Sequence, residues 1–284
     1  MDAGILLKFY EAGERNFSGV DLQGEDLSGA TLIGVDLSGA NLTGASLSRA
    51  FLTGSDLSEA FLNWADLRYM KLSDGVMADA DLTKANLQGA FLVKASLGGA
   101  KLSGSNLAHV NLRNANLRRA NLCGANLRGS NLRNANLFHA NLNWANLGEA
   151  RLSGANLKGA FLHEVNLQGA YLNGLDLQGV NLSGINLSAA KLSGANLEGA
   201  NLSSCNLNEA SLKGVRLTGA NLTNANLSAA YLSKAHLDWS DLTHANFTEA
   251  NLHGVRLLGT CATGAQFTDA LLSIESQRQL SLIP

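Results

Sequence analysis

The chain has 284 residues, and its 23 acidic and 21 basic side chains leave a formal net charge of −2. A charge so close to zero predicts no obligatory anionic or cationic partner. No apolar run approaches the ~18 residues that a membrane span needs, and the first residues lack the basic and apolar segments of a signal peptide. We therefore expect no membrane association and a cytoplasmic location.

The N-terminal segment, residues 1–14, is predicted to form a helical cap. Asp2 is a favourable N-cap residue, and Leu6, Phe9 and Tyr10 recur on one side at helical spacing. The five-residue repeat that follows this segment is predicted to form stacked strands. The first edge of such a stack exposes unpaired backbone groups, which a helix can cover.

Residues 15–272 form one long repeat with a period of five. The third position of each pentapeptide is apolar and almost always Leu, as in Ala195-Asn196-Leu197-Glu198-Gly199. Side chains alternate in an extended chain, so the first and third positions face inward together and the second faces outward. Glycine at the fifth position fits a type II turn, which needs φ > 0 there. Each pentapeptide is therefore predicted to be a short strand followed by a corner.

Sampling the second position every twenty residues separates two kinds of column. The asparagine column is nearly uniform and contains Asp26, Ser46, Asp66, Asn86, Asn106, Asn126, Asn146, Asn166, Asn186, Asn206, Asn226, Asn246 and Gln266. The varied column lies five residues further along and contains Thr31, Phe51, Lys71, Phe91, Asn111, Asn131, Arg151, Tyr171, Lys191, Ser211, Tyr231, Asn251 and Leu271.

A coil of four pentapeptides explains this contrast, because residues twenty apart would then stack about 4.8 Å from one another. Stacked Asn side chains can form amide ladders, whereas stacked Asp side chains would repel. The sequence therefore predicts an all-β, four-sided solenoid of about 13 coils, roughly 60 Å long.

Three further features concern the interior of the predicted solenoid. The first position is mostly Ala, since a close-packed interior filled by Leu leaves little room. Glu25 occupies such a position, and we expect its carboxylate to bond to backbone donors beneath the N-terminal cap. Residues 68–79 keep the register but lose the preferred residues, so they are a candidate for a bulge.

These residues resemble the pentapeptide repeat family, whose members carry tandem A(D/N)LXX units, over roughly nine-tenths of the chain. The resemblance implies a right-handed, quadrilateral parallel β-helix with the Leu and Ala positions inward. The handedness comes from the family alone. The N-terminal segment, with Leu6, Tyr10 and Phe17, is similar to that of cyanobacterial members.

Charge is segregated along the repeat. Residues 1–81 are net acidic, whereas residues 82–148 contain no Asp or Glu. The candidate interaction residues of this basic stretch are Arg113, Arg118, Arg128 and Arg133. Arg113 and Arg133 are expected to stack in adjacent coils, and an anionic partner surface would relieve their repulsion. The alternative is that exposed arginines splay apart in water.

The varied column is the second candidate surface. It interleaves aromatic and cationic residues, namely Phe51, Phe91, Tyr171, Tyr231, Lys71, Arg151 and Lys191. Exposed aromatic residues beside cations are typical of interface anchors. The alternative is that aromatic residues simply suit the surface of a sheet.

Residues 273–284 are a weaker helical candidate. They could cap the last coil or pair end to end with a second copy, which leaves the oligomeric state open.

Reactive chemistry has little support in the sequence. The histidines, which are His109, His139, His163, His236, His244 and His253, do not gather with Cys or carboxylates at the spacing of a metal site. Cys123, Cys205 and Cys261 are odd in number and far apart, which favours free thiols. We predict no catalytic, cofactor-binding or metal-binding residues and no cofactor.

The leading functional hypothesis is a non-enzymatic protein whose rigid wall binds another macromolecule, most simply a protein. The alternative comes from the family, some of whose members mimic duplex DNA and bind DNA gyrase or another type II topoisomerase. That mimicry needs extended acidic columns, which the asparagine column does not provide. A third possibility is nucleic-acid binding through the basic residues 84–133.

Overall fold

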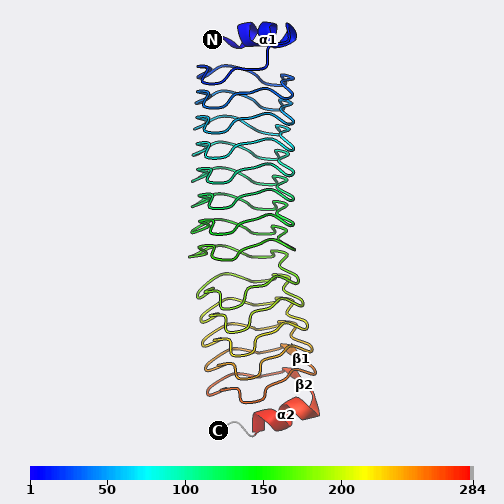
Figure 1. Cartoon of the computed structure of the whole chain (residues 1–284). Helices are drawn as coiled ribbons and strands as arrows, with labels where there is room; N and C mark the ends of the chain where they lie inside the picture. Colours follow the sequence, from blue (N-terminus) through cyan, green and yellow to red (C-terminus); the bar gives the residue numbers. More distant parts are fainter. Residues whose placement is uncertain (282–284) are drawn as a thin grey trace. The chain divides into compact units, whose positions relative to one another are not determined.

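The computed structural model describes residues 1–281 and contains two compact units. The first unit holds Met1–Asn146 and Ala155–Phe161, and the second holds Leu147–Gly154 and the described residues from Leu162 onward. The helices and strands of the described chain are α1 (Ala3–Glu11), β1 (Asn251–Leu252), β2 (Leu271–Leu272) and α2 (Ile274–Ser281) (Figure 1). Residues 282–284, the end of the predicted C-terminal segment, lie outside the described residues.

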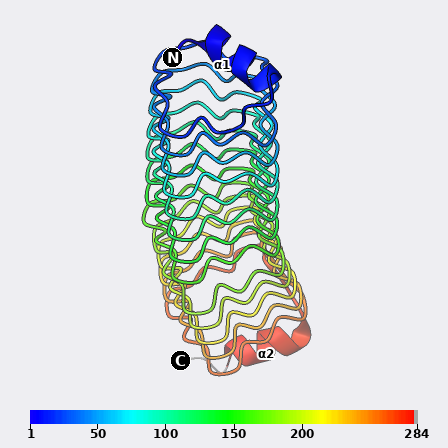
Figure 2. The same cartoon turned by 45° about the horizontal axis from the view of Figure 1, so that its top comes forward.

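Parallel pairing between residues twenty apart runs through each unit. In the first unit Asp26 pairs with Ser46, whose N–H donates to the Glu25 carbonyl at 2.9 Å. In the second unit Asn206 pairs with Asn226 in the same way. Most pairings are single bridges, because each pentapeptide turns after three extended residues. Each unit is therefore a stack of twenty-residue coils, as predicted for a β-solenoid (Figure 2).

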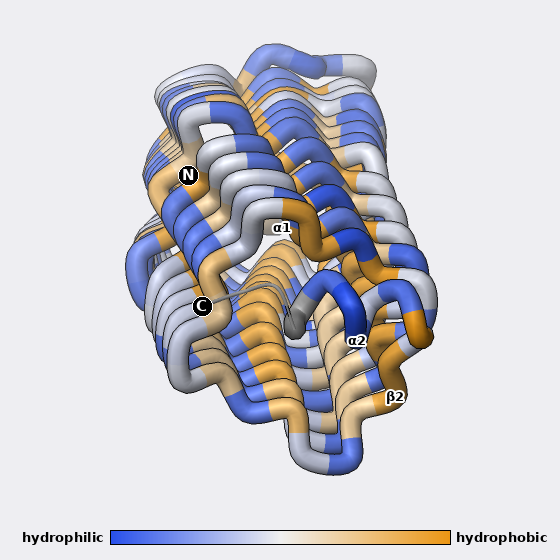
Figure 3. Tube along the Cα trace, turned by 90° about the horizontal axis from the view of Figure 1, so that it is seen from below, coloured by the Kyte–Doolittle hydropathy of each residue, from blue (hydrophilic) through white to orange (hydrophobic). Residues whose placement is uncertain are grey.

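The interior of each unit is built from the first and third positions. Ala120 and Leu127 are fully buried in the first unit, as are Ala195 and Leu197 in the second. Figure 3 shows hydrophobic and hydrophilic residues recurring at the same place in successive coils. Full burial of each Leu side chain stabilises the fold by roughly 2 kcal/mol relative to exposure. The small first position leaves the room that these leucines need.

The corner after Leu197 is a type II turn, as predicted. The Ala200 N–H donates to the Leu197 carbonyl at 3.1 Å, and Gly199 has φ of 62°. Many corners have no glycine, however, and Trp64 and Lys84 adopt φ of 60° and 58°. No Val, Ile or Thr occurs among the described residues with positive φ, because branching at Cβ makes this conformation costly.

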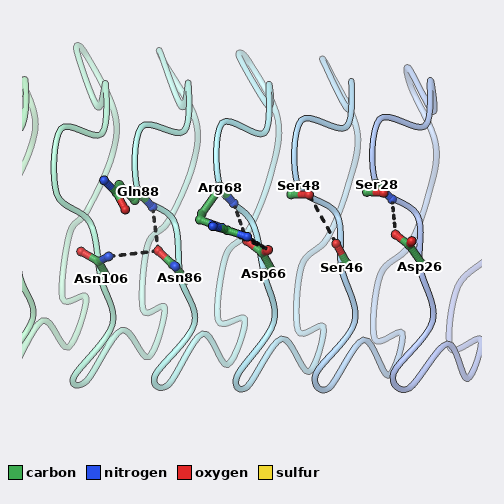
Figure 4. A network of polar contacts seen from close by, with 9 residues as sticks. All are labelled: Asp26, Ser28, Ser46, Ser48, Asp66, Arg68, Asn86, Gln88 and Asn106. Carbon is green, nitrogen blue, oxygen red and sulfur yellow. Dashed lines mark hydrogen bonds and ion pairs between the residues drawn. The ribbon is translucent and has the colours of Figure 1, made fainter.

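Second-position asparagines join each corner to the neighbouring coil. The Asn86 Oδ1 accepts from the Gln88 N–H at 3.2 Å and from the Asn106 Nδ2 at 3.0 Å (Figure 4). An aspartate can accept the first bond, as Asp26 does from the Ser28 N–H, but it has no N–H group to donate to the preceding coil. The predicted amide ladder is confirmed where side-chain hydrogen bonds join successive asparagines of this column, as from Asn86 through Asn106 to Asn126.

The helix α1 is bonded to the coil that follows it. The Asp2 Oδ1 accepts from the Ile5 N–H at 2.8 Å and caps the helix, and Leu6 is fully buried. The Glu25 Oε2 accepts from the Ala3 N–H at 2.9 Å. The prediction that Glu25 bonds to backbone donors beneath this segment is confirmed.

The helix α2 is bonded to the last coils of the second unit. The Ser276 Oγ donates to the Val255 carbonyl at 3.1 Å, and the Gln279 Oε1 accepts from the Leu257 N–H at 2.9 Å. These bonds satisfy backbone groups that the end of a β-stack would otherwise expose.

Residues 68–79 form no bulge. The bridges of Lys71 to Phe51 and of Val76 to Asp56 keep the twenty-residue register. Met70 and Met77 are fully buried, because an unbranched thioether side chain adapts to irregular interior space. The suggestion from the sequence that residues 68–79 bulge is therefore wrong.

Candidate protein-binding surface

The structure brings three predicted residues of the varied column together in the first unit. Phe51, Lys71 and Phe91 are successive bridge partners. The Phe51 and Phe91 side chains are 38% and 44% exposed, and the Lys71 Nζ lies 4.3 Å from the centroid of the Phe51 ring. A cation over an aromatic face is attracted by the ring quadrupole. We call these three residues the aromatic cluster.

Two of the predicted arginines extend the aromatic cluster. Asn111 and Asn131 continue the varied column beyond Phe91, and Arg113 and Arg133 lie two residues after them. Both arginine side chains are exposed. The backbone N–H groups of Arg113 and Arg133 donate to the Oδ1 atoms of Asn111 and Asn131, each at 3.3 Å. This side of the first unit therefore combines flat aromatic surface with a run of positive charge.

The varied column continues within the second unit. Arg151, Tyr171 and Lys191 are successive bridge partners, and Ser211 separates them from Tyr231. Tyr171 is 41% exposed and Tyr231 is 56% exposed. Tyrosine offers a rigid apolar surface with a polar tip, a combination enriched at interfaces. The second unit thus presents a polar-aromatic version of the same surface.

The remaining predicted arginines lie elsewhere. Arg118 and Arg128 belong to two other columns of the first unit, and the Arg118 Cζ lies 4.9 Å from the centroid of the Phe138 ring. The acid-free stretch is therefore a basic belt distributed over several columns, of which only Arg113 and Arg133 adjoin the aromatic cluster.

Sequence reasoning overlooked two exposed aromatic residues outside the varied column, Phe61 and Phe161. Phe61 and Phe161 are second-position residues of another column in the first unit, and they are 53% and 58% exposed. Trp64 occupies a corner, where the Lys84 Nζ lies 4.9 Å from its ring centroid. Reading every outward column, rather than two, would have revealed Phe61 and Phe161.

An open hollow of about 360 Å³ lies on the first unit. It is lined by Ser28, Gly29, Ser48, Arg49, Arg68 and Tyr69. The Arg68 Nη2 lies 2.6 Å from the Asp66 Oδ2 (Figure 4), and the bonds from this guanidinium lower the pKa of the Asp66 carboxyl. The hollow therefore presents hydroxyl groups and one aromatic ring beside two arginines, of which Arg68 is paired with Asp66.

The described residues contain no group of three or more His, Cys, Asp or Glu able to hold a metal ion. Cys123, Cys205 and Cys261 are free thiols. Burial raises the pKa of Cys205 to about 11, whereas a hydrogen bond with the Thr243 hydroxyl lowers the pKa of the exposed Cys261. No helix of the described chain has the length and apolar character required to cross a membrane.

The repeat sequence decides the family. Overlapping segments, from 16–49 at one end to 236–273 at the other, match the Pentapeptide repeats. The chain is a pentapeptide repeat protein. The resemblance inferred from the A(D/N)LXX units is confirmed over nearly the whole of their extent.

Several solved structures are similar to this pentapeptide repeat protein. HetL, involved in heterocyst differentiation regulation in the cyanobacterium Nostoc sp. strain PCC 7120, is 30% identical over 96% of this chain and 97% of its own, with a TM-score of 0.27. A pentapeptide repeat protein of the Arabidopsis thaliana thylakoid lumen is 34% identical over 38% of this chain and 76% of its own, with a TM-score of 0.38.

QnrB1, a plasmid-mediated fluoroquinolone resistance protein, is 17% identical over 82% of this chain and 98% of its own, with a TM-score of 0.37. A search of the curated proteins finds no match. The membership of this pentapeptide repeat protein in its family therefore rests on the repeat sequence.

Proposed function

We propose that this protein is a non-enzymatic interaction protein that binds a protein partner through the varied column. The observation that carries the proposal is the aromatic cluster, in which Lys71 lies between the exposed rings of Phe51 and Phe91. Aromatic and cationic side chains account for much of the binding energy at protein interfaces. Arg113 and Arg133 add a basic margin that favours a partner with acidic groups near its contact surface.

A rigid scaffold strengthens this proposal. The backbone around Lys71 is hydrogen-bonded on both sides. The Lys71 N–H donates to the Ala50 carbonyl of the preceding coil at 2.9 Å, and the adjacent Leu72 N–H donates to the Phe91 carbonyl of the following coil at 2.9 Å. A preorganised surface loses less conformational entropy on binding than a mobile loop does. The varied column is thus suited to recognition by shape and charge.

The test is quantitative capture of partners from native lysate on the tagged full-length chain. The variant carries Phe51→Asn, Phe91→Asn, Tyr171→Asn and Tyr231→Asn, which places the repeat's own preferred residue at each site. The control carries Phe61→Asn and Phe161→Asn, which remove two rings of similar or greater exposure from another column. We expect a partner retained by the wild type and the control to fall at least about tenfold in yield with the variant, as for loss of a hot spot.

If both variants capture the same proteins in the same yield as the wild type, the varied column is not the interface. Circular dichroism of each variant at the same temperature establishes that the comparison is between folded proteins.

The alternative function, DNA mimicry toward DNA gyrase or another type II topoisomerase, has less support. The varied column is basic or neutral from Lys71 to Arg151, and the asparagine column is neutral from Asn86 to Asn246. A DNA supercoiling assay with gyrase and micromolar protein separates the two functions, because protein binding through the varied column predicts no effect. Direct nucleic-acid binding through residues 84–133 would be recognised by a steep loss of affinity with salt.

We further infer that the solenoid is a right-handed, quadrilateral β-helix of about 13 coils, with residues 1–14 and 273–284 as terminal segments around the repeat of residues 15–272. The twenty-residue bridges in four second-position columns support the four sides, and membership in the pentapeptide repeat family supports the handedness. The free cysteines favour a reducing compartment, and we place the protein in the cytoplasm.

A further inference from the structure

One side of the first unit carries a charge gradient along the stack of coils. Its second-position residues form a continuous ladder of bridges: Asp36, Asp56, Val76, Ser96, Asn116, Asn136 and Asn156. We call this ladder, with the fourth- and fifth-position residues that follow each member, the graded face. It lies entirely within the first unit and does not include the varied column.

The first half of the graded face is acidic. It carries Asp36, Asp56, Glu59 and Asp79, and Asp36 and Asp56 are direct bridge partners. None of these carboxylates has a cationic side chain within 4.0 Å among the described residues. Like charges stacked on adjacent strands destabilise a sheet. A positive surface brought against this half would relieve that repulsion.

The other half of the graded face is basic. It carries Arg118, Arg119 and Lys158, all exposed, together with His139. The charge segregation extends beyond this side of the unit. Residues 1–81 contain 13 acidic and 5 basic residues, whereas residues 82–148 contain no acidic residue and 8 basic residues. The acidic and basic halves are therefore two ends of one surface.

The middle of the graded face is flat. The coil between the two halves presents Ser96, Gly98 and Gly99, and the Asp79 carboxylate of the preceding coil extends over Gly99. Gly98 has no left-handed φ, and a Cβ placed on it would lie 3.7 Å from the Asn116 Nδ2, an ordinary contact. The backbone at Gly98 would accept a side chain, so the turn does not require glycine there. The lack of a side chain at Gly98 leaves the surface open at this position.

The two halves are arranged symmetrically about this flat coil. The coil of Asp79 is one step before it and the coil of Arg118 is one step after it, and the coils of Asp36 and Lys158 are three steps away on either side. An antiparallel, two-fold pairing centred on the flat coil would therefore set each acidic coil against a basic or histidine-bearing coil. A parallel pairing would set like charges together.

We propose that the graded face is a self-complementary surface that pairs antiparallel with the graded face of a second copy of this chain. Its seven coils span about 30 Å at about 4.8 Å per coil. A strip of that length buries less than the roughly 1,200 Å² typical of stable interfaces, so the dimer is weak and held largely by charge. This inference does not depend on the proposed function, because it uses another side of the molecule.

The experiment is sedimentation velocity of the full chain at about 100 μM, with salt raised from about 50 to about 500 mM to screen surface charge. The wild type should be largely dimeric at low salt and monomeric at high salt. The acidic variant, Arg118→Glu with Arg119→Glu, and the basic variant, Glu59→Lys with Asp79→Lys, should each be monomeric. Glu and Lys already occupy fifth-position corners, as at Glu149 and Lys84, and Glu198 occupies a fourth position, so these changes suit the fold.

The decisive arm mixes the acidic and basic variants in equal amounts. The coils on both sides of the flat centre are then acidic on one partner and basic on the other, and a heterodimer should form at low salt. Gly98→Lys should abolish wild-type pairing by filling the flat centre, whereas the control Arg113→Glu with Arg133→Glu should leave it intact.

A wild type that is monomeric at low salt would overturn the proposal. A mixture of the acidic and basic variants that remains monomeric would also overturn it. A dimer that persists in the acidic variant alone and in the basic variant alone would do so too, since that dimer would use another surface. Unchanged thermal midpoints show that each variant is folded.

Discussion

At the scale of single residues, the second position explains why this repeat prefers Asn to Asp. An oxygen alone suffices to bond the turn, and Asp26, Asp36 and Asp56 all supply it. The amide nitrogen adds a bond to the preceding coil, as from the Asn126 Nδ2 to the Asn106 Oδ1 at 3.2 Å. Uniform asparagine columns thus maximise bonding between coils, whereas stacked aspartates weaken it.

Buried serine at the first position gives the first prediction. The Ser130 Oγ is buried and has no hydrogen-bond partner. Ser130→Ala removes an unpaired polar group and restores the repeat's preferred residue, so the free energy of unfolding should rise by about 1 kcal/mol. Urea denaturation measures the change.

The matched control for Ser130 is Ser55→Ala. The Ser55 hydroxyl donates to the Leu32 carbonyl at 2.9 Å and accepts from the Val35 N–H at 3.1 Å. Its removal leaves two buried backbone groups without these bonds and should lower stability by about 1 kcal/mol. Equal effects of the two substitutions would contradict this account.

The cysteines give a prediction of reactivity with pH. The Cys205 thiol donates to the Leu182 carbonyl at 2.6 Å, and burial raises its pKa to about 11. The hydrogen bond with Thr243 lowers the pKa of the exposed Cys261 and so increases its thiolate fraction at neutral pH. Since the thiolate is the nucleophile, iodoacetamide at pH 8 should modify Cys261 first and leave Cys205 intact in the folded protein.

Peptide mass spectrometry over time checks the order of modification. Adding urea should expose Cys205 and bring its rate up to that of Cys261. Early modification of Cys205 without denaturant would refute the buried, protonated state.

At the scale of the element, the corner is more than a turn. A side chain at the fifth position can extend over the corner of the next coil: a Cβ on Gly89 would lie 2.5 Å from the Tyr69 ring, and one on Gly259 would lie 2.3 Å from the Trp239 ring. These glycines therefore serve both the left-handed backbone and the ring that covers them.

Substitution at two glycines separates these roles. Gly89 and Gly44 have φ of 66° and 67°, but nothing lies within 4 Å of a Cβ on Gly44. Both Gly→Ala changes cost about 1 kcal/mol for the left-handed conformation. Gly89→Ala should cost roughly 0.5–1 kcal/mol more, because Tyr69 has to leave its contact with the corner.

Thermal unfolding of both variants measures the difference, and a Tyr69→Ala background supplies the control. In that background the two substitutions should have the same effect. A difference that persists without the Tyr69 ring would show that the contact is not its cause.

At the scale of the whole molecule, the coil was predictable because it follows from period and volume. The Leu and Ala positions specify the interior, and the contrast between two columns specifies a twenty-residue repeat. The bond from Ala3 to Glu25 was predictable because a carboxylate at an inward position needs a donor. Each of these inferences depends on a residue type placed in a known position.

Other features could not be derived in that way. The overlap of Tyr69 with Gly89 depends on side-chain direction at positive φ, which sequence spacing does not specify. The absence of a bulge at residues 68–79 depends on how Met70 and Met77 fold into the interior. The charges of the graded face were visible in the sequence, but their alignment on one side required the register of the bridges.

The spacing of the bridges also bears on how the chain reaches its fold. Pairing partners lie twenty residues apart throughout each unit, which corresponds to a relative contact order of about 0.07, in the range of helical bundles rather than of most β-proteins. Little loop-closure entropy is lost in adding one coil to the coil before it. A β-protein of this kind can therefore fold progressively, coil by coil, as it leaves the ribosome.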